Sequence, residues 1–171
     1  MAARCLETIV LTALRLDEAR EGTWDELDFD NKVWTIPANR MKAEKEHRVP
    51  LSAAALTVLK GMADIRQSDY VFPGAQGGAV AKTMPWRLLK QLAGNVTIHG
   101  FRSSFRDWAA ERTSYPREVA EMALAHTIPN AVEAAYLRSD LFEKRRRLMS
   151  AWADYCGKPT ATAKVLPIRV R

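Results

Sequence analysis

The sequence is poor in cysteine and histidine and contains no long apolar run. Its 171 residues include only Cys5 and Cys156 as cysteines, so a disulfide framework is excluded and a reducing compartment is expected. No apolar stretch approaches the ~18 residues that a membrane span requires, and the apolar run at residues 8–11 is too short for a signal-peptide core. These absences predict a cytoplasmic protein without a membrane partner.

Nucleotide-dependent and zinc-dependent chemistry are disfavoured for similar reasons. The three histidines and two cysteines show no metal-ligand spacing such as HExxH or CxxC, and no glycine pattern fits a phosphate-binding loop. We therefore expect no cofactor and no metal site. The 26 lysines and arginines outnumber the 20 acidic residues, which gives a formal net charge of +6. This excess permits a polyanionic partner but is too modest to establish one.

The periodicity of apolar residues predicts a mostly helical α+β fold. Helices are expected over residues 3–14, 17–20, 54–65, 82–92, 101–112, 116–125 and 140–155, with a further helix opened by Pro129 and Asn130. Alternation over residues 23–27, 32–36 and 48–51 predicts a small three-stranded antiparallel sheet, in which residues 37–47 form a charged hairpin loop. The helical pattern ends near residue 157, so we expect one domain over residues 1–157 and a tail over 158–171.

Six polar residues stand out by their order along the chain. They are Arg15, Lys42, His99, Arg102, His126 and Tyr136. Each has an ordinary structural explanation. Arg15 could cap a helix or pair with Glu18. A lone histidine is usually a cap or a half-buried ring, and Tyr136 could belong to an apolar helix face. The charged hairpin could be only a solvated turn.

Taken in this order, the six residues resemble the active-site set of the tyrosine recombinase, or phage integrase, family. The resemblance covers residues 11–154 and extends to the local sequence of prophage and genomic-island integrases at residues 34–37, 41–42, 49–52, 71–73, 99–102 and 152–155. It implies a DNA breaking-and-rejoining catalytic domain. Ala13 and Ala125 stand where many members have glycine; both are small, so close packing is expected to survive.

The resemblance implies a role for each residue in cutting a DNA phosphodiester. Arg15 and Arg102 would bind the non-bridging oxygens and stabilise the charge of the transition state. The other implied roles are proton transfer by His99, a hydrogen bond to a phosphate oxygen from His126, protonation of the departing 5′-hydroxyl by Lys42, nucleophilic attack by Tyr136, and support of the site by Glu18. The resulting 3′-phosphotyrosine conserves the energy of the phosphoester, so rejoining would need neither ATP nor metal.

The implied partner is double-stranded DNA at attachment sites, bound by a bacterial or phage-encoded protein at the nucleoid. Tetramers on DNA are implied for the full-length protein, while this chain alone could be monomeric. The family usually carries core-binding and arm-binding domains before the catalytic one, and we expect these N-terminal domains to be absent from this chain. The residues 145–147 form a basic band that could meet acidic residues of a neighbouring protomer. Contacts with the phosphate backbone are expected from Arg40, Lys45, Arg48, Lys82, Arg87 and Lys90, unless these only solvate the surface.

Three alternative interpretations remain open. A truncated or decayed integrase would act only as a DNA-binding module. A type IB topoisomerase-like enzyme would share the chemistry and relax supercoiled plasmid without resolving junctions. A plain helical interaction domain would have no affinity for DNA at low salt. In the tail, an apolar cluster is expected to pack on a protein surface, in cis or on a neighbour: Val165, Leu166, Ile168 and Val170.

Overall fold

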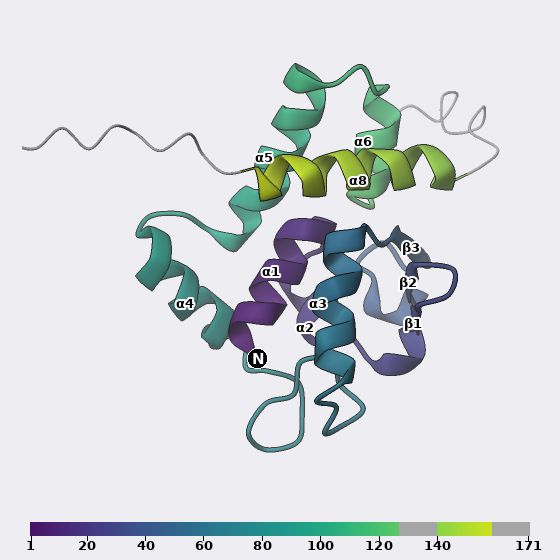
Figure 1. The fold of residues 1–171 in the computed structure, drawn as a ribbon. Helices are drawn as coiled ribbons and strands as arrows, with labels where there is room; N and C mark the ends of the chain where they lie inside the picture. Colours follow the sequence, from purple (N-terminus) through teal and green to yellow (C-terminus); the bar gives the residue numbers. More distant parts are fainter. Residues whose placement is uncertain (127–139, 159–171) are drawn as a thin grey trace, which may run out of the picture.

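The computed structural model describes residues 1–126 and 140–158, and helices dominate within them (Figure 1). The helices are α1 (Ala2–Thr12), α2 (Leu16–Arg20), α3 (Ala53–Ala63), α4 (Thr83–Ala93), α5 (Ile98–Arg112), α6 (Arg117–Ala123) and α8 (Phe142–Gly157), with two short 3₁₀ helices, η1 (Trp24–Glu26) and η2 (Ala38–Arg40). The predicted helix that Pro129 and Asn130 would open and the tail from residue 159 onward lie outside the described residues.

Three antiparallel strands form the predicted sheet in the order β1 (Leu27–Asp28), β2 (Val33–Ile36) and β3 (His47–Pro50). The register pairs Leu27 with Trp34, and Trp34 with Val49. The sequence predicts the first strand over residues 23–27, but only Leu27 of this range lies in it, because Trp24–Glu26 turn as η1. The turn carries the buried Glu26 carboxylate inward, where it accepts a hydrogen bond from Trp34 Nε1 at 2.8 Å.

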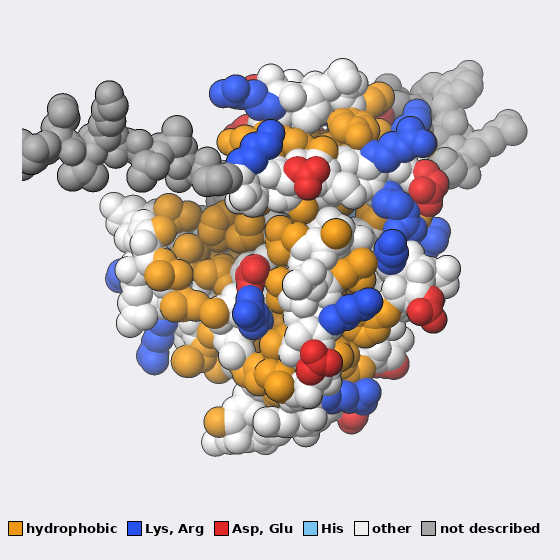
Figure 2. All heavy atoms as spheres, in the orientation of Figure 1, with side chains coloured by type: hydrophobic (Ala, Val, Ile, Leu, Met, Phe, Trp, Pro, Cys, Tyr) orange, Lys and Arg blue, Asp and Glu red, His pale blue; other side chains and the backbone are white. Residues whose placement is uncertain are grey.

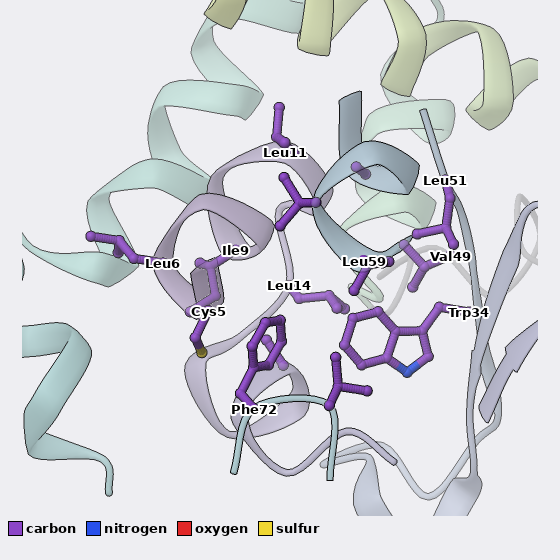
Figure 3. Close-up of a cluster of buried hydrophobic side chains, with 14 of the residues drawn as sticks. Cys5, Leu6, Ile9, Leu11, Leu14, Trp34, Val49, Leu51, Leu59 and Phe72 are labelled. Atoms are coloured by element: carbon purple, nitrogen blue, oxygen red, sulfur yellow. The ribbon is translucent and has the colours of Figure 1, made fainter. Parts of the chain in front are cut away.

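The larger apolar cluster lies between α1, α3 and the sheet. It includes the fully buried side chains of Leu14, Trp34, Leu59 and Phe72 (Figure 3). A Cβ atom on Gly22 would stand 2.1 Å from the Trp34 ring, so only glycine allows the chain to pass this close. Burial of these large side chains is the main force that fixes the sheet against the helices.

A second apolar cluster joins α5, α6 and α8, which lie together above α1 and α3 in Figure 1. The rings of Phe105, Trp108 and Trp152 meet in tilted or edge-to-face geometry, with centroids between 5.1 and 6.2 Å apart, as aromatic rings prefer. Trp152 Nε1 also donates to the Val10 backbone oxygen at 2.6 Å. This bond fixes α8 to α1 and links the two clusters.

Two helices begin two or more residues away from their predicted first residues. Helix α5 starts at Ile98 instead of residue 101, because the Thr97 hydroxyl caps it by accepting a hydrogen bond from the Gly100 N–H at 3.0 Å. Helix α8 starts at Phe142 instead of residue 140, since the Asp140 carboxylate accepts from the Phe142 N–H at 3.1 Å. The earlier start of α5 places His99 inside its first turn.

The surface carries an apolar groove of about 490 Å³ that runs beside α1 and α4. Leu6, Val10, Leu88, Leu92 and Cys156 are among its lining residues. Figure 2 shows hydrophobic side chains gathered over these two helices. No helix within residues 1–126 and 140–158 is both long enough and apolar enough to cross a membrane.

Candidate active site

Arg102 is the buried centre of a polar cluster. It projects from α5 and is 4% exposed. Its Nη2 donates to the Leu124 backbone oxygen at 2.5 Å, and its Nη1 donates to the Ala13 backbone oxygen. Burial, together with the charge of nearby Arg15, lowers the pKa of Arg102 to about 10, so the guanidinium is charged at neutral pH. One side chain therefore connects the ends of α1 and α6 and holds a cation between them.

The two carbonyls that accept from Arg102 belong to Ala13 and Leu124. Ala13 adopts the left-handed backbone conformation, and so does Ala125, which directly follows Leu124. Ala13 has a φ of 54° and Ala125 has a φ of 49°. This conformation strains any residue with a Cβ atom and favours glycine, which gives a physical reason for the glycine that the resemblance implies at these positions. The expected close packing is found at Ala13, which is 1% exposed, while Ala125 is only partly buried.

Arg15 and Glu18 form a pair at the start of α2. The Arg15 N–H donates to Glu18 Oε2 at 2.8 Å, and Arg15 Nη1 donates to Oε1 at 2.7 Å. Glu18 is 4% exposed, while the Arg15 side chain keeps 31% of its surface exposed. The buried carboxylate thus caps the helix and orients an accessible guanidinium at the same time.

A Schellman motif ends α6 and positions His126. The His126 N–H donates to the Glu121 carbonyl at 2.9 Å, and the Ala125 N–H donates to the Met122 carbonyl at 3.1 Å. The same reversal brings the His126 ring to the Glu121 side chain, with Nδ1 2.6 Å from Oε2. The other ring nitrogen, Nε2, lies 3.3 Å from Arg102 Nη2.

Sequence reasoning missed Glu121. Its carboxylate is 14% exposed and also accepts from Arg106 Nε at 2.8 Å. Burial works against its ionisation, but hydrogen bonds from His126 and Arg106 hold the pKa of Glu121 below its usual value. The available signal was a carboxylate five residues before a histidine, the separation that a Schellman motif closes.

The structure brings together four of the residues that the sequence singled out: Arg15, Glu18, Arg102 and His126. His99 is exposed in the first turn of α5, and Lys42 is exposed in the turn before β3. Tyr136 lies outside the described residues. In residues 1–126 and 140–158, no group of three or more histidines, cysteines or carboxylates is placed to hold a metal ion.

A cavity of about 700 Å³ opens beside His126, between the hairpin and the C-terminal end of α6. Lys45, His47, Met122 and His126 are among its lining residues. The prediction that His47 ends the hairpin loop is wrong, because His47 opens β3 and is buried. Burial, followed by the charge of Arg145, lowers the pKa of His47 to about 4, so this ring is neutral at pH 7.

The basic residues expected to contact DNA fall into two groups. Arg40 is internal: it pairs with Glu26 and donates to the Glu18 backbone oxygen at 2.6 Å. Since this guanidinium supports the site from within, we leave Arg40 out of the DNA-binding set. The exposed members are Lys45, Arg48, Lys82, Arg87 and Lys90.

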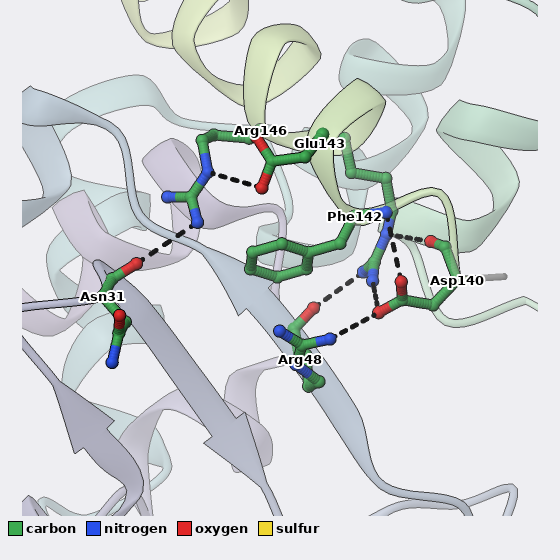
Figure 4. Close-up of polar contacts among 7 residues, drawn as sticks. Asn31, Arg48, Asp140, Phe142, Glu143 and Arg146 are labelled. Carbon is green, nitrogen blue, oxygen red and sulfur yellow. Dashed lines mark hydrogen bonds and ion pairs between the residues drawn. The ribbon is translucent and has the colours of Figure 1, made fainter.

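Two residues of the basic band of α8, Arg145 and Arg146, make contacts toward the sheet (Figure 4). Arg145 is 2% exposed and donates to the Arg48 backbone oxygen at 2.7 Å and to Asp140 Oδ2 at 2.8 Å. Arg146 donates to the Asn31 backbone oxygen at 3.2 Å. The hydrogen-bonding groups of Arg145 are used within the chain, whereas Arg147 is exposed. The contact of this band with a neighbouring protomer stays a prediction.

The chain is similar to known proteins over most of its length. Residues 2–141 match the phage integrase family. Prophage integrase IntA of Escherichia coli (strain K12) is 39% identical over 160 residues, which cover 90% of this chain and 38% of that protein. The integrase of Enterobacteria phage P4 is 32% identical over 170 residues, covering 85% of this chain and 38% of that protein. The chain thus spans 38% of the length of these two curated relatives.

Solved structures share the fold at low sequence identity. The integrase from mycobacterium phage Brujita aligns with a TM-score of 0.69 and 16% identity over 94% of this chain and 54% of that chain. The XerA recombinase aligns with a TM-score of 0.59 and 16% identity over 93% of this chain and 64% of that chain. The predicted recombinase-type α+β fold is confirmed.

Proposed function

The chain belongs to the phage integrase family, and we propose that it cleaves and rejoins DNA at specific sites through a 3′-phosphotyrosine on Tyr136. The observation that carries the proposal is the meeting of Arg15, Arg102 and His126 from three separate segments of the chain. Two guanidiniums and an imidazole around one point form a binding site suited to a phosphodiester.

The two arginines act on the phosphate. Each terminal nitrogen of Arg102 carries two hydrogens, and a backbone carbonyl takes one from each. The bonds to Ala13 and Leu124 fix the plane of the guanidinium before DNA arrives. Preorganised donors of this kind stabilise the charge that develops on the non-bridging oxygens in the transition state.

Two proton transfers complete the reaction. A tyrosine hydroxyl has a pKa of ~10 in model peptides, so the attack needs a base. In this proposal, Tyr136 loses its proton to His99 as its oxygen bonds to phosphorus. The bond from phosphorus to the 5′-oxygen breaks, and Lys42 gives a proton to the leaving oxygen. Attack by that 5′-hydroxyl on the phosphotyrosine reverses the sequence and rejoins the strand.

The proposed partner is double-stranded DNA bearing an attachment site, in the cytoplasm of a bacterial cell. Lys45, Arg48, Lys82, Arg87 and Lys90 are proposed to contact phosphates. The matched structures include a lambda integrase dimer bound to a core site, with a TM-score of 0.55 and 17% identity, and a Tn1549 integrase in complex with circular intermediate DNA, with a TM-score of 0.59 and 17% identity. We propose a tetramer on DNA for the full-length protein and a monomer for this chain alone.

A junction-resolution assay separates this function from its rivals. The core sequence is first selected from a randomised duplex pool, and a four-way junction built on it is then incubated with the chain. Resolution into duplex products is expected. Relaxation of supercoiled plasmid without resolution would favour a topoisomerase-like enzyme, and binding without either product would favour a DNA-binding module.

A further inference from the structure

A continuous chain of contacts runs from α5 through α6 to the proposed phosphate site. Arg106 Nε donates to Glu121 Oε1 at 2.8 Å, Glu121 Oε2 faces His126 Nδ1 at 2.6 Å, and His126 Nε2 lies 3.3 Å from Arg102 Nη2. Arg117 Nε approaches Glu121 Oε1 at 3.6 Å. Two cations thus face one oxygen of the carboxylate, and the histidine faces the other.

We propose that Glu121 is a positioning residue for DNA cleavage: it accepts the Nδ1 proton of His126 and thereby turns Nε2 toward the scissile phosphate, beside Arg102. The inference rests on the proposed function. Glu121 itself touches no reacting atom, so its effect on cleavage passes entirely through the orientation and protonation of His126.

The tautomer of His126 follows from the hydrogen-bonding groups around it. An ionised carboxylate can only accept hydrogen bonds, so Nδ1 must carry a proton. In the neutral ring the lone pair then stands on Nε2, where Arg102 Nη2 can donate to it. A hydrogen bond from Nε2 to a phosphate oxygen requires a second proton on the ring. The negative charge of Glu121 would stabilise that imidazolium, because a neighbouring carboxylate favours the charged form of a histidine.

The backbone supports the same geometry. The bond from the His126 N–H to the Glu121 carbonyl fixes the histidine above Glu121, and the Arg106 contact at 2.8 Å restrains the carboxylate from its other side. The ring is therefore held by its backbone and by Nδ1, which leaves Nε2 as its one nitrogen available to a ligand. A purely structural ion pair would not need the histidine to present a particular nitrogen.

The first test measures the tautomer of His126 by ¹⁵N NMR of the histidine-labelled chain at a pH where the ring is neutral. In the native chain and in the matched control Glu118→Gln, one turn earlier on α6, Nδ1 should carry the proton. Glu121→Ala should shift the population toward the Nε2–H form. Glu121→Gln should restore the Nδ1–H form, because its amide oxygen still accepts. An Nδ1–H form that persists in Glu121→Ala would overturn the proposal.

The second test measures single-turnover cleavage and duplex affinity of the same variants on the selected core duplex. Glu121→Ala should cleave roughly 10–100-fold more slowly, the loss typical of removing the carboxylate that orients a metal-binding histidine, with little change in affinity. Unchanged cleavage, or a loss shared by Glu118→Gln, would overturn the proposal. A native chain that never cleaves would refute the proposed function instead, while the tautomer measurement, which needs no DNA, would still decide whether Glu121 controls His126.

Discussion

The Glu18 carboxylate binds Arg15 at both its backbone and its side chain, with Oε2 2.8 Å from the Arg15 nitrogen and Oε1 2.7 Å from Nη1. Glu18 is almost fully buried, whereas Arg15 remains partly exposed. A carboxylate inside the fold therefore fixes the position of a cation at its surface. The proposed first phosphate ligand depends on this pairing for its orientation.

Replacing Glu18 should lower the stability of the fold. Glu18→Ala removes a helix cap and leaves a partly buried guanidinium without its partner, so the free energy of unfolding should fall by about 1–3 kcal/mol. Urea denaturation measures this loss. The matched control is Glu7→Ala, which breaks an exposed pair with Arg4 and should cost less than ~0.5 kcal/mol. Equal losses in the two variants would show that Glu18 does not buttress Arg15.

Ala125→Gly should stabilise the protein. Ala125 adopts a φ of 49° at the end of α6, a conformation that costs alanine ~1–2 kcal/mol. Glycine removes this strain, but its greater conformational freedom in the unfolded chain offsets ~0.4–1 kcal/mol of the stabilisation. The net increase should be about 0.5–1 kcal/mol, measured by chemical denaturation. Ala120→Gly, inside the same helix, should instead destabilise by about 1 kcal/mol. If both variants lose stability, the Schellman geometry of α6 is wrong.

His47 should make the fold weaker in acid. Its pKa is lowered from 6.5 to about 4 by burial and by Arg145, so the unfolded chain binds more protons than the folded chain between these pH values. Stability is therefore complete above pH 6.5 and is lost as the pH falls toward 4, by at most ~3 kcal/mol. His47→Gln removes this term. The free energies of unfolding of the native chain and of His47→Gln, measured at pH 7 and pH 4.5, test this prediction. Equal losses of stability in the two proteins would show that His47 is not the cause.

Local patterns in the sequence predicted most of the elements, because apolar spacing depends on neighbours within a few residues. The sheet order and the helix positions follow from it. The first strand, expected over residues 23–27, begins only at Leu27, since the buried contacts of Glu26 with Trp34 and Arg40 favour a turn before it. Those contacts join residues 8 and 14 positions apart, beyond the reach of an alternation pattern.

The candidate site could be predicted where its residues resemble the active-site set of the family. It could not be predicted where contacts join segments that are distant in the sequence. Arg102 bonds to the Ala13 carbonyl across 89 positions of the chain. The supporting residues Glu121 and Arg106 belong to no conspicuous motif, and only the packing of α5 against α6 brings them together. For the same reason Arg40 looked like a surface cation, although its guanidinium turns inward to Glu26.

The most direct test of the account is the identity of the nucleophile. A nicked suicide duplex carrying the selected core is incubated with the chain, without metal or ATP, and analysed on a denaturing gel. The native chain and Tyr155→Phe, whose ring stacks on Trp152, should both give a slowly migrating covalent protein–DNA band. Tyr136→Phe should bind the duplex with unchanged affinity and give no such band. A covalent band that persists in Tyr136→Phe would contradict the account.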